Sequence, residues 1–249
     1  MTYDFLSPHA ASPFAGATPI ARSPIEHELV RAGASFQVTD GWNVATAFAS
    51  PASELQAARH TVAISDRSSL AKFELQAPAA QLDELATRYA GGPPALGHAR
   101  EHEGAWLCPI TRQRLLVLAE PAHGAALRRR LEQCAGELAF ASVVDLTVGL
   151  AAILVLGPRA RDLLATLTAL DLRPQAAAVG AVRPGSVARV PAIVLHEHDS
   201  RFLVLFGAAQ AQYMWTVIAD AGRPLDAAFV GTDLVARLDD ADTSGSEHA

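Results

Sequence analysis

The densest group of side chains able to bind a metal or move a proton is the run His196-Glu197-His198-Asp199. Alternate residues of a strand share one face, so His196 and His198 could hold one zinc ion with their neutral imidazoles. A catalytic zinc site needs three protein ligands, and only the acidic neighbours in this run could supply the third. We therefore interpret the run as a polar hairpin tip and expect no bound metal.

Two further groups are read as structural. The segment 98–103 is rich in His and Glu and is interpreted as a solvated loop or hairpin. Cys108 follows Trp106 and precedes Pro109, and no base or cationic residue nearby would activate its thiol. We expect Cys108 to serve as a small buried apolar residue.

Aromatic side chains could supply stacking surface for a flat heterocyclic ligand. Trp106, beside a Gly-rich loop, is the better pocket candidate, whereas Trp215 lies in a helical pattern and is expected in the core. The aromatic residues considered for such a pocket are Trp42, Tyr89, Trp106, Phe202 and Trp215.

Several functional classes are disfavoured by composition and motifs. The sequence contains no P-loop, no GxSxG elbow, no GxGxxG after a strand and no HExxH. A net charge of −6 with scattered arginines argues against a nucleic-acid partner. No apolar run reaches the roughly 18 residues of a membrane span, and the first residues lack the basic and apolar parts of a secretory signal. We expect a soluble, cytoplasmic protein.

The elements that would position these residues centre on Val143–Leu172. Ala151–Leu156 has the length and apolarity of a strand, Gly157-Pro158 ends it, and Arg159–Leu170 has helical periodicity. A similar strand, proline and helix occur at Leu70–Leu75, Pro78 and Ala79–Tyr89. This echo predicts an α+β fold made of two duplicated units.

The predicted organisation has four parts: a disordered leader at 1–22, a first α+β unit at 23–138, a second at 139–238 and a disordered acidic tail at 239–249. The segment Pro224–Leu238 is predicted to form the last strand.

Four segments resemble the aminomethyltransferase family, which includes the T protein of the glycine cleavage system and the gamma subunit of sarcosine oxidase. In Ala57–Leu75 the residues that match the family pattern are Asp66, Ser68, Leu70 and Lys72. The segments that carry the resemblance are Ser23–Trp42, Ala57–Leu75, Ile153–Leu164 and Arg201–Trp215. Together they span roughly Ser23–Asp239, and the second half is especially similar to the gamma subunit.

The resemblance implies a folate-binding fold of two tandem ferredoxin-like units, in which the T protein holds tetrahydrofolate in a central channel. The C-terminal barrel domain of the T protein is expected to be absent. The resemblance also implies a hairpin at His102–Arg114 with an acidic pair near Leu107–Pro109, where this sequence has no carboxylate. Loss of a charge-stabilising carboxylate costs orders of magnitude in rate.

Three functions follow as alternatives from the resemblance. The first is an accessory subunit of a heteromeric amine-oxidising complex with flavoprotein partners, the second a stand-alone tetrahydrofolate-dependent aminomethyl or methyl transferase, and the third a non-catalytic binding module. No catalytic residue is assigned. The residues expected to bind tetrahydrofolate are Leu70, Tyr89, Trp106, Glu197 and Asp199.

Overall fold

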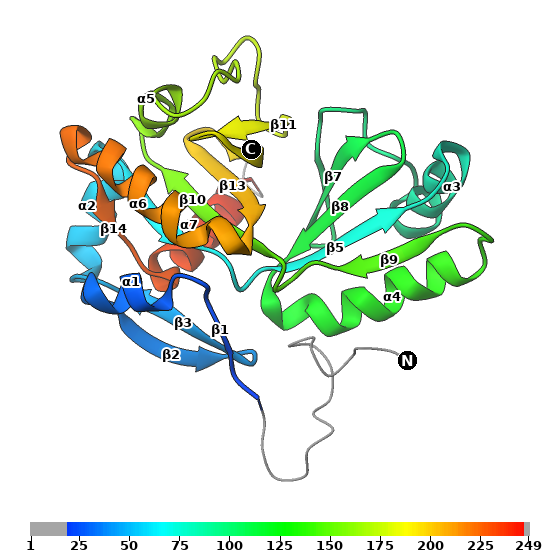
Figure 1. Ribbon diagram of the computed structural model, residues 1–249, viewed down its shortest axis with the longest axis horizontal. Coiled ribbons are helices and arrows are strands. Elements are labelled where there is room, and N and C mark those ends of the chain that lie inside the picture. Colours follow the sequence, from blue (N-terminus) through cyan, green and yellow to red (C-terminus); the bar gives the residue numbers. More distant parts are fainter. Residues whose placement is uncertain (1–18, 247–249) are drawn as a thin grey trace.

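Residues 19–246 are described by the computed structural model, with side chains described as far as residue 241. This part of the chain contains three β-sheets and seven α-helices, which confirms the predicted α+β class (Figure 1). None of these helices is long and apolar enough to cross a membrane. Most of the predicted leader, residues 1–18, lies outside the described residues, and so do residues 247–249.

A five-stranded antiparallel sheet with two helices on one face forms the first ferredoxin-like unit. Its chain order is strand, helix, hairpin, helix, strand, which places the last strand beside the first. In order across the sheet, the strands are β6 (Arg100–His102), β7 (Ala105–Thr111), β8 (Arg114–Ala119), β5 (Ala71–Gln76) and β9 (Ser142–Asp145). The covering helices are α3 (Ala79–Ala90) and α4 (Gly124–Gly136).

A six-stranded sheet forms the second unit, with α5 (Ala160–Ala165) and α6 (Ala211–Gly222) packed on one face. In order across the sheet, the strands are β11 (Val182–Val187), β12 (Val190–His198), β13 (Arg201–Gly207), β10 (Leu150–Leu156), β4 (Ala63–Asp66) and β14 (Ala228–Phe229). Strand β4 precedes the first unit in sequence, yet it pairs with β10, where a ferredoxin-like unit has its fourth strand. Strand pairing thus crosses the predicted ranges 23–138 and 139–238 at β4 and also at β9, so these ranges stay a prediction.

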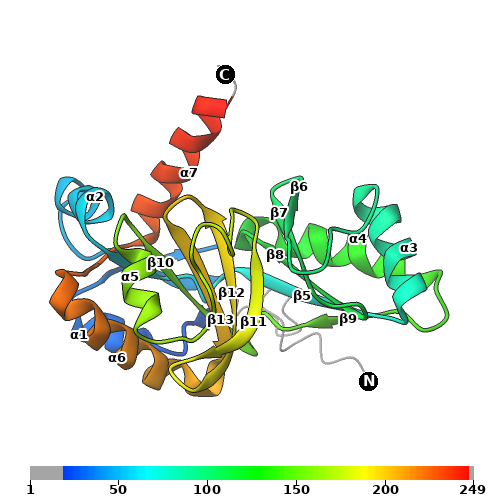
Figure 2. The same ribbon diagram turned by 90° about the horizontal axis from the view of Figure 1, so that it is seen from above.

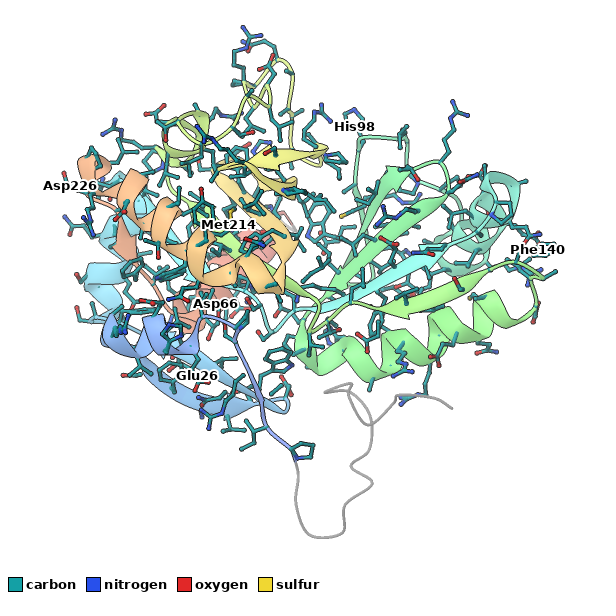
Figure 3. The ribbon with its side chains drawn as sticks, in the orientation of Figure 1. Glu26, Asp66, His98, Phe140, Met214 and Asp226 are labelled. Carbon is teal, nitrogen blue, oxygen red and sulfur yellow. The ribbon has the colours of Figure 1, made fainter. Side chains whose placement is uncertain are left out.

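The two sheets pack face to face, and the sequence shows why. Successive residues of a strand point to opposite faces, so a continuous apolar run suits a strand that is buried on both sides. In β8, Leu115 and Val117 contact the helices of the first unit, whereas Leu116 and Leu118 face the second sheet. The sheets also meet at one edge, where His98 bridges to Ala181 (Figure 3).

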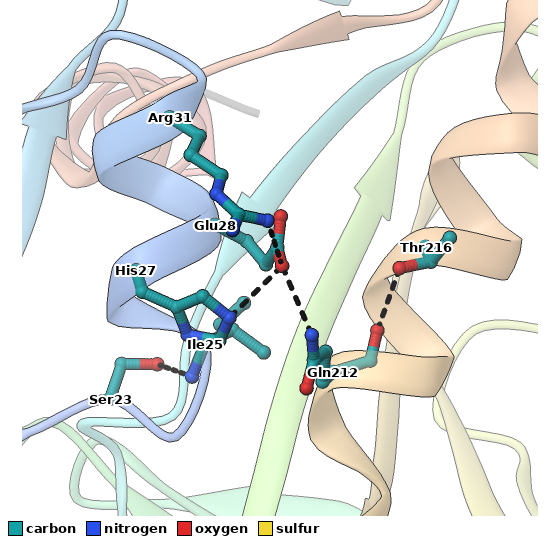
Figure 4. Close-up of polar contacts among 7 residues, drawn as sticks. All are labelled: Ser23, Ile25, His27, Glu28, Arg31, Gln212 and Thr216. Atoms are coloured by element: carbon teal, nitrogen blue, oxygen red, sulfur yellow. Dashed lines mark hydrogen bonds and ion pairs between the residues drawn. The ribbon is translucent and has the colours of Figure 1, made fainter.

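An N-terminal layer packs on the second unit. It contains a three-stranded sheet, β1 (Ala21–Arg22), β3 (Trp42–Ala47) and β2 (Ser35–Thr39), and two helices, α1 (Glu26–Arg31) and α2 (Pro51–His60). Helix α1 contacts α6 through Glu28, whose Oε1 accepts a hydrogen bond from Gln212 Nε2 at 3.3 Å (Figure 4). The carboxylate of Glu54 on α2 accepts the backbone N–H groups of Phe48, Ala49 and Gly231.

The C-terminal segment differs from the predicted strand and disordered tail. Only Ala228–Phe229 forms a strand, and α7 (Thr232–Ser246) then projects from the body of the molecule (Figure 2). The physical reason is helical spacing, because Leu234, Val235 and Leu238 lie on one face of α7 and pack against the core. The part of the acidic tail that the structure describes, residues 239–246, is therefore helical.

Candidate functional site

A cavity of about 540 Å³ lies where the two sheets and α7 meet. Leu70, Trp106 and Leu118 give it apolar walls, and charged side chains from both units surround them. The residues that line it are Arg67, Leu70, Glu101, Gly104, Trp106, Leu118, Ala119, Glu120, His123, Glu197, His198, Arg201 and Asp239. We call this space the central cavity.

Glu197, near the end of β12, has the most perturbed carboxylate of the central cavity. Burial raises the pKa of Glu197 to about 7, although the positive charges of Arg201 and Arg67 oppose this increase. No hydrogen bond or ion pair links its carboxylate to another residue within the described part of the chain. The carboxylate is thus half-buried and able to accept hydrogen bonds from a ligand.

Two ion pairs flank Glu197. Arg67, in the connection between β4 and β5, pairs with Glu120 at the end of β8. Arg201, at the start of β13, pairs with Asp239 of α7 at 2.6 Å. Each arginine already faces a carboxylate, which leaves the charge of Glu197 only partly compensated.

The structure brings together three of the five residues expected to bind folate. Leu70 is buried in the wall, Trp106 is half-buried beside it, and Glu197 comes from the second unit. The ring of His198 meets Trp106 edge to face, with centroids 6.3 Å apart. A hairpin of each unit therefore supplies one part of the same cavity.

The other two residues lie elsewhere. Tyr89 belongs to the helix side of the first unit, where its ring contacts His102 and the guanidinium of Arg130. Asp199 is exposed on the turn between β12 and β13 and lines a neighbouring cavity. Helix α3 turns Tyr89 toward its own sheet, which the predicted helical face containing Leu82 and Leu85 already implied.

Both ring nitrogens of His196 face backbone carbonyl oxygens. Its Nδ1 lies 3.0 Å from the carbonyl oxygen of Ala177, and its Nε2 lies 3.3 Å from that of Asp199. The ring stacks on Phe202 at 4.4 Å. Across the described residues, no group of three His, Cys, Asp or Glu side chains is placed to hold a metal ion.

The position of the missing acidic pair is filled by core residues. Leu107, Cys108 and Pro109 are buried in β7, and burial raises the pKa of the Cys108 thiol far above its usual value. Glu101 lies on β6 directly opposite Trp106 and reaches the rim of the central cavity. The sheet therefore brings a carboxylate to this cavity from the neighbouring strand.

Sequence reasoning missed the four charged residues of the flanking ion pairs. Arg67 could have been found, because it lies between Asp66 and Ser68 in the segment that resembles the family. Arg201 likewise begins the similar segment Arg201–Trp215. Glu120 and Asp239 carried no such signal, since their pairing with the arginines depends on how α7 and the two sheets pack.

Asp66, Ser68 and Lys72, which match the family pattern, do not line the central cavity. Lys72 Nζ donates to the carbonyl oxygens of Ser68 and Leu70 at 2.8 Å and of Thr147 at 3.1 Å. Ser68 and Leu70 connect β4 to β5, and Thr147 connects β9 to β10. Lys72 thus links both segments that pass between the units.

Comparison with solved structures shows the same fold in two proteins. The glycine cleavage system aminomethyltransferase T from Bartonella henselae superposes with a TM-score of 0.72 at 16% identity, over 86% of this chain and 60% of that one. A chain of heterotetrameric sarcosine oxidase from Corynebacterium sp. U-96 superposes with a TM-score of 0.64 at 20% identity, over 84% of this chain and 97% of that one. No curated protein matches significantly.

This chain therefore spans about 60% of the length of the aminomethyltransferase, and the barrel domain is not among its described elements. The family model described as the GCVT N-terminal domain matches residues 25–239, which is most of the sequence. The match includes both sheets, the crossing segments and the central cavity. The chain belongs to the GCVT N-terminal domain family.

Proposed function

We propose that this protein is a folate-binding subunit of a heteromeric amine-oxidising complex, with the pterin of tetrahydrofolate in the central cavity. The observation that carries the proposal is the half-buried Glu197 carboxylate between the apolar walls of that cavity. A reduced pterin is flat and has an edge of N–H donors. The cavity offers a matching acceptor and flat apolar surface.

The walls come from both units. Leu70 and Leu118 would contact one face of the pterin ring, and Trp106 would supply aromatic surface. Glu197 would accept hydrogen bonds from the pterin N–H groups in its ionised form, which the neighbouring Arg67 and Arg201 favour. Tetrahydrofolate, when bound, supplies the nitrogen that accepts a one-carbon group.

Binding should therefore depend on pH. Since the pKa of Glu197 is raised to about 7, affinity is expected to increase as pH rises through 7 and to level off above it. Calorimetric titration of the purified chain with tetrahydrofolate measures this. Glu197→Gln should weaken binding by more than about 1.5 kcal/mol, because it removes a charged hydrogen-bond partner.

Glu132→Gln is the matched control, because it removes an exposed carboxylate of α4 that does not line the central cavity. Its affinity should equal that of the wild type. A folded wild-type protein that does not bind tetrahydrofolate, or equal losses in the two variants, would contradict the assignment of the site.

Two observations support the subunit role. The match to the heterotetrameric sarcosine oxidase covers nearly the whole of that chain, so the two are similar in extent. In addition, Leu107, Cys108 and Pro109 replace the expected acidic pair. Flavoprotein partners are expected to co-purify in fixed stoichiometry with a tagged chain from its own cells, with flavin absorbance and amine-dependent oxygen uptake. A tagged chain that elutes alone from those cells would argue against the complex.

A stand-alone transferase is the second candidate, and Glu101 favours it. This residue places a carboxylate at the rim of the central cavity, where it could stabilise a cationic amine donor. The test is one-carbon transfer from an aminomethyl donor to tetrahydrofolate by the purified chain. Activity that falls at least tenfold in Glu101→Gln, with tetrahydrofolate affinity unchanged, would support this role.

A further inference from the structure

A cavity of about 260 Å³ lies in the first unit, between α3, the loop that follows it and the end of the β7–β8 hairpin. It shares no lining residue with the central cavity. Two of its lining residues, Leu82 and Leu115, belong to the core between the first sheet and its helices, so it lies on the face of the sheet that points away from the second unit. We call it the helix-side cavity.

One face of α3 forms a wall of the helix-side cavity. Four residues of α3 line it at the spacing i, i+3, i+4 and i+7, which places them on the same side of a helix. These residues are Ala79, Leu82, Asp83 and Ala86. Three of them are apolar, and Asp83 therefore places a single carboxylate in an otherwise apolar wall.

The loop between α3 and β6 forms a second wall. Pro93 and Pro94 line the cavity with fixed φ angles and no N–H donors, and Leu96 leaves 56% of its surface exposed there. The guanidinium of Arg100 donates to the carbonyl oxygen of Gly92 at 2.6 Å, which holds the start of the loop. Walls that are formed in advance lower the entropic cost of binding a ligand.

Two charged side chains of opposite sign line the cavity, Asp83 from α3 and Arg112 from the β7–β8 turn. Neither forms an ion pair or a side-chain hydrogen bond with the other, or with any further residue that the structure describes. The nearby Arg114, in contrast, pairs with Glu74 at 2.6 Å. A free carboxylate and a free guanidinium at one apolar cavity complement a ligand that carries both an ammonium and a carboxylate group.

The volume of the cavity limits the size of that ligand. A volume of about 260 Å³ corresponds to about nine water molecules at roughly 30 Å³ each. It lies below the roughly 300 Å³ at which pockets for drug-sized molecules begin. A ligand of about nine non-hydrogen atoms fits this space, which is the size of leucine.

From these observations we propose that the helix-side cavity binds a free aliphatic α-amino acid of the size of leucine. The ammonium group pairs with Asp83 and the carboxylate group with Arg112. The aliphatic side chain lies against Leu82, Leu96 and Leu115. The inference does not depend on the proposed function, because the two cavities have no residue in common.

The test is an NMR titration of the isotopically labelled full chain with three probes. These are L-leucine, 3-methylbutylamine, which lacks the carboxylate, and 4-methylpentanoate, which lacks the ammonium group. The wild type is expected to bind leucine with a dissociation constant below about 1 mM, at least about fivefold more tightly than either fragment. The amide signals that move should be those of α3, the loop after it and the β7–β8 turn.

Two charge variants assign the two ends of the ligand. Asp83→Asn should weaken the binding of leucine and of the amine about fivefold and leave the affinity for 4-methylpentanoate unchanged. Arg112→Gln should weaken the binding of leucine and of 4-methylpentanoate by a similar factor and leave the affinity for the amine unchanged. Factors of this size are expected for charges that are exposed to solvent.

Glu132→Gln and Arg129→Gln are the matched controls, because both residues are exposed on α4 and neither lines the cavity. Ala79→Leu should abolish leucine binding, since the larger side chain fills the cavity and suits a helix. Three results would overturn the proposal: a folded wild type whose signals do not move with millimolar leucine, equal affinities for leucine and its fragments, or equal losses in the controls. None of these results would bear on tetrahydrofolate binding, which is titrated separately.

Discussion

The two ferredoxin-like units differ in how they complete their sheets and in what they supply to the central cavity. The first unit takes its fourth strand, β9, from its own end, and its β7–β8 hairpin presents Trp106 and Leu118. The second unit takes β4 from the segment before the first unit, and its β12–β13 hairpin presents Glu197 and Arg201. The first unit thus supplies most of the apolar surface together with the carboxylates of Glu101 and Glu120, and the second unit supplies Glu197 and Arg201.

The comparison teaches that the second unit depends on the rest of the chain to complete its sheet. Strand β4 comes from before the first unit in the sequence, yet it fills the place of the fourth strand in the second sheet. The N-terminal layer packs over it. A site that takes residues from both units then forms only when the crossing segments are in place. Four predictions test this dependence.

The largest effect is expected for Gly231→Ala. A Cβ atom on Gly231 would lie only 1.8 Å from the carbonyl oxygen of Thr46 in β3, so the N-terminal layer would have to move away from α7. We expect the free energy of unfolding to fall by about 3 kcal/mol or more, as in severe overpacking. Chemical denaturation measures this.

The control is Gly136→Ala in α4 of the first unit, where no atom lies within 4 Å of the added Cβ. Alanine is favoured over glycine in a helix, so stability should rise by up to about 1 kcal/mol. Similar losses in both variants would contradict the idea that the second unit is the one that depends on the N-terminal layer.

A somewhat smaller effect is expected for Lys72→Met. The change leaves the carbonyl oxygens of Ser68, Leu70 and Thr147 without their ammonium partner, and we expect a loss of about 2–3 kcal/mol at pH 7. Both units should unfold at lower denaturant concentration, because the crossing segments belong to both.

Lys72 also predicts a pH dependence. Burial lowers its pKa to about 7, against the opposing charges of Asp66 and Asp145, so between pH 7 and 10.5 the unfolded chain binds the proton that the folded chain has lost. Wild-type stability should therefore rise with pH over this range relative to Lys72→Met. A constant difference between the two proteins from pH 7 to pH 10 would contradict the assigned pKa.

Glu197→Gln is expected to raise the free energy of unfolding by about 1 kcal/mol at pH 8 in the absence of ligand, after allowance for the partial exposure of Glu197. The folded pKa of Glu197, about 7, is above the ordinary value of 4.5, so its folded state keeps a proton that the unfolded state has lost. Wild-type stability should fall as pH rises from 4.5 to 7, and the variant should lack this decrease. Thermal unfolding as a function of pH, with Asp199→Asn as control, distinguishes the two.

The smallest effect is expected at a turn of the second unit. Ala188 and Arg189 join β11 to β12 with φ values of 48° and 66°, a left-handed conformation that favours glycine. Arg189→Gly should raise the free energy of unfolding by about 0.5–1 kcal/mol. Arg112→Gly, in the β7–β8 turn without positive φ, should lower it by a few tenths of a kcal/mol. If both substitutions changed the free energy of unfolding in the same direction, the two turns would not differ in backbone strain.

Local pattern was a good guide where a single element decides the outcome. The apolar run Ala151–Leu156 is β10 with one further residue, and the predicted helix Ala79–Tyr89 matches α3 closely. The predicted helix Arg159–Leu170 is shorter in the structure, because α5 ends at Ala165. The α+β class and the family followed from such segments.

The candidate site was predicted only in part. Leu70, Trp106 and Glu197 lie on strands or connections that border the central cavity, and pattern and resemblance together indicated them. Tyr89 lies outside the cavity, because an aromatic residue on this helical face is buried against its own sheet. The predicted last strand is confirmed only as the short β14, and the chain after it is helical because Leu234, Val235 and Leu238 lie on one helical face.

By itself, the sequence determined which segments are buried on both faces, where prolines and glycines end the strands, and that no carboxylate occupies 107–109. Only the tertiary structure decided that β4 completes the second sheet, that Lys72 holds both crossing segments and that Arg201 meets Asp239. The physical reason is the separation in sequence over which each interaction acts. Turns and periodicity act between neighbours in the chain, whereas strand exchange and the pairing of charges depend on which surfaces pack together.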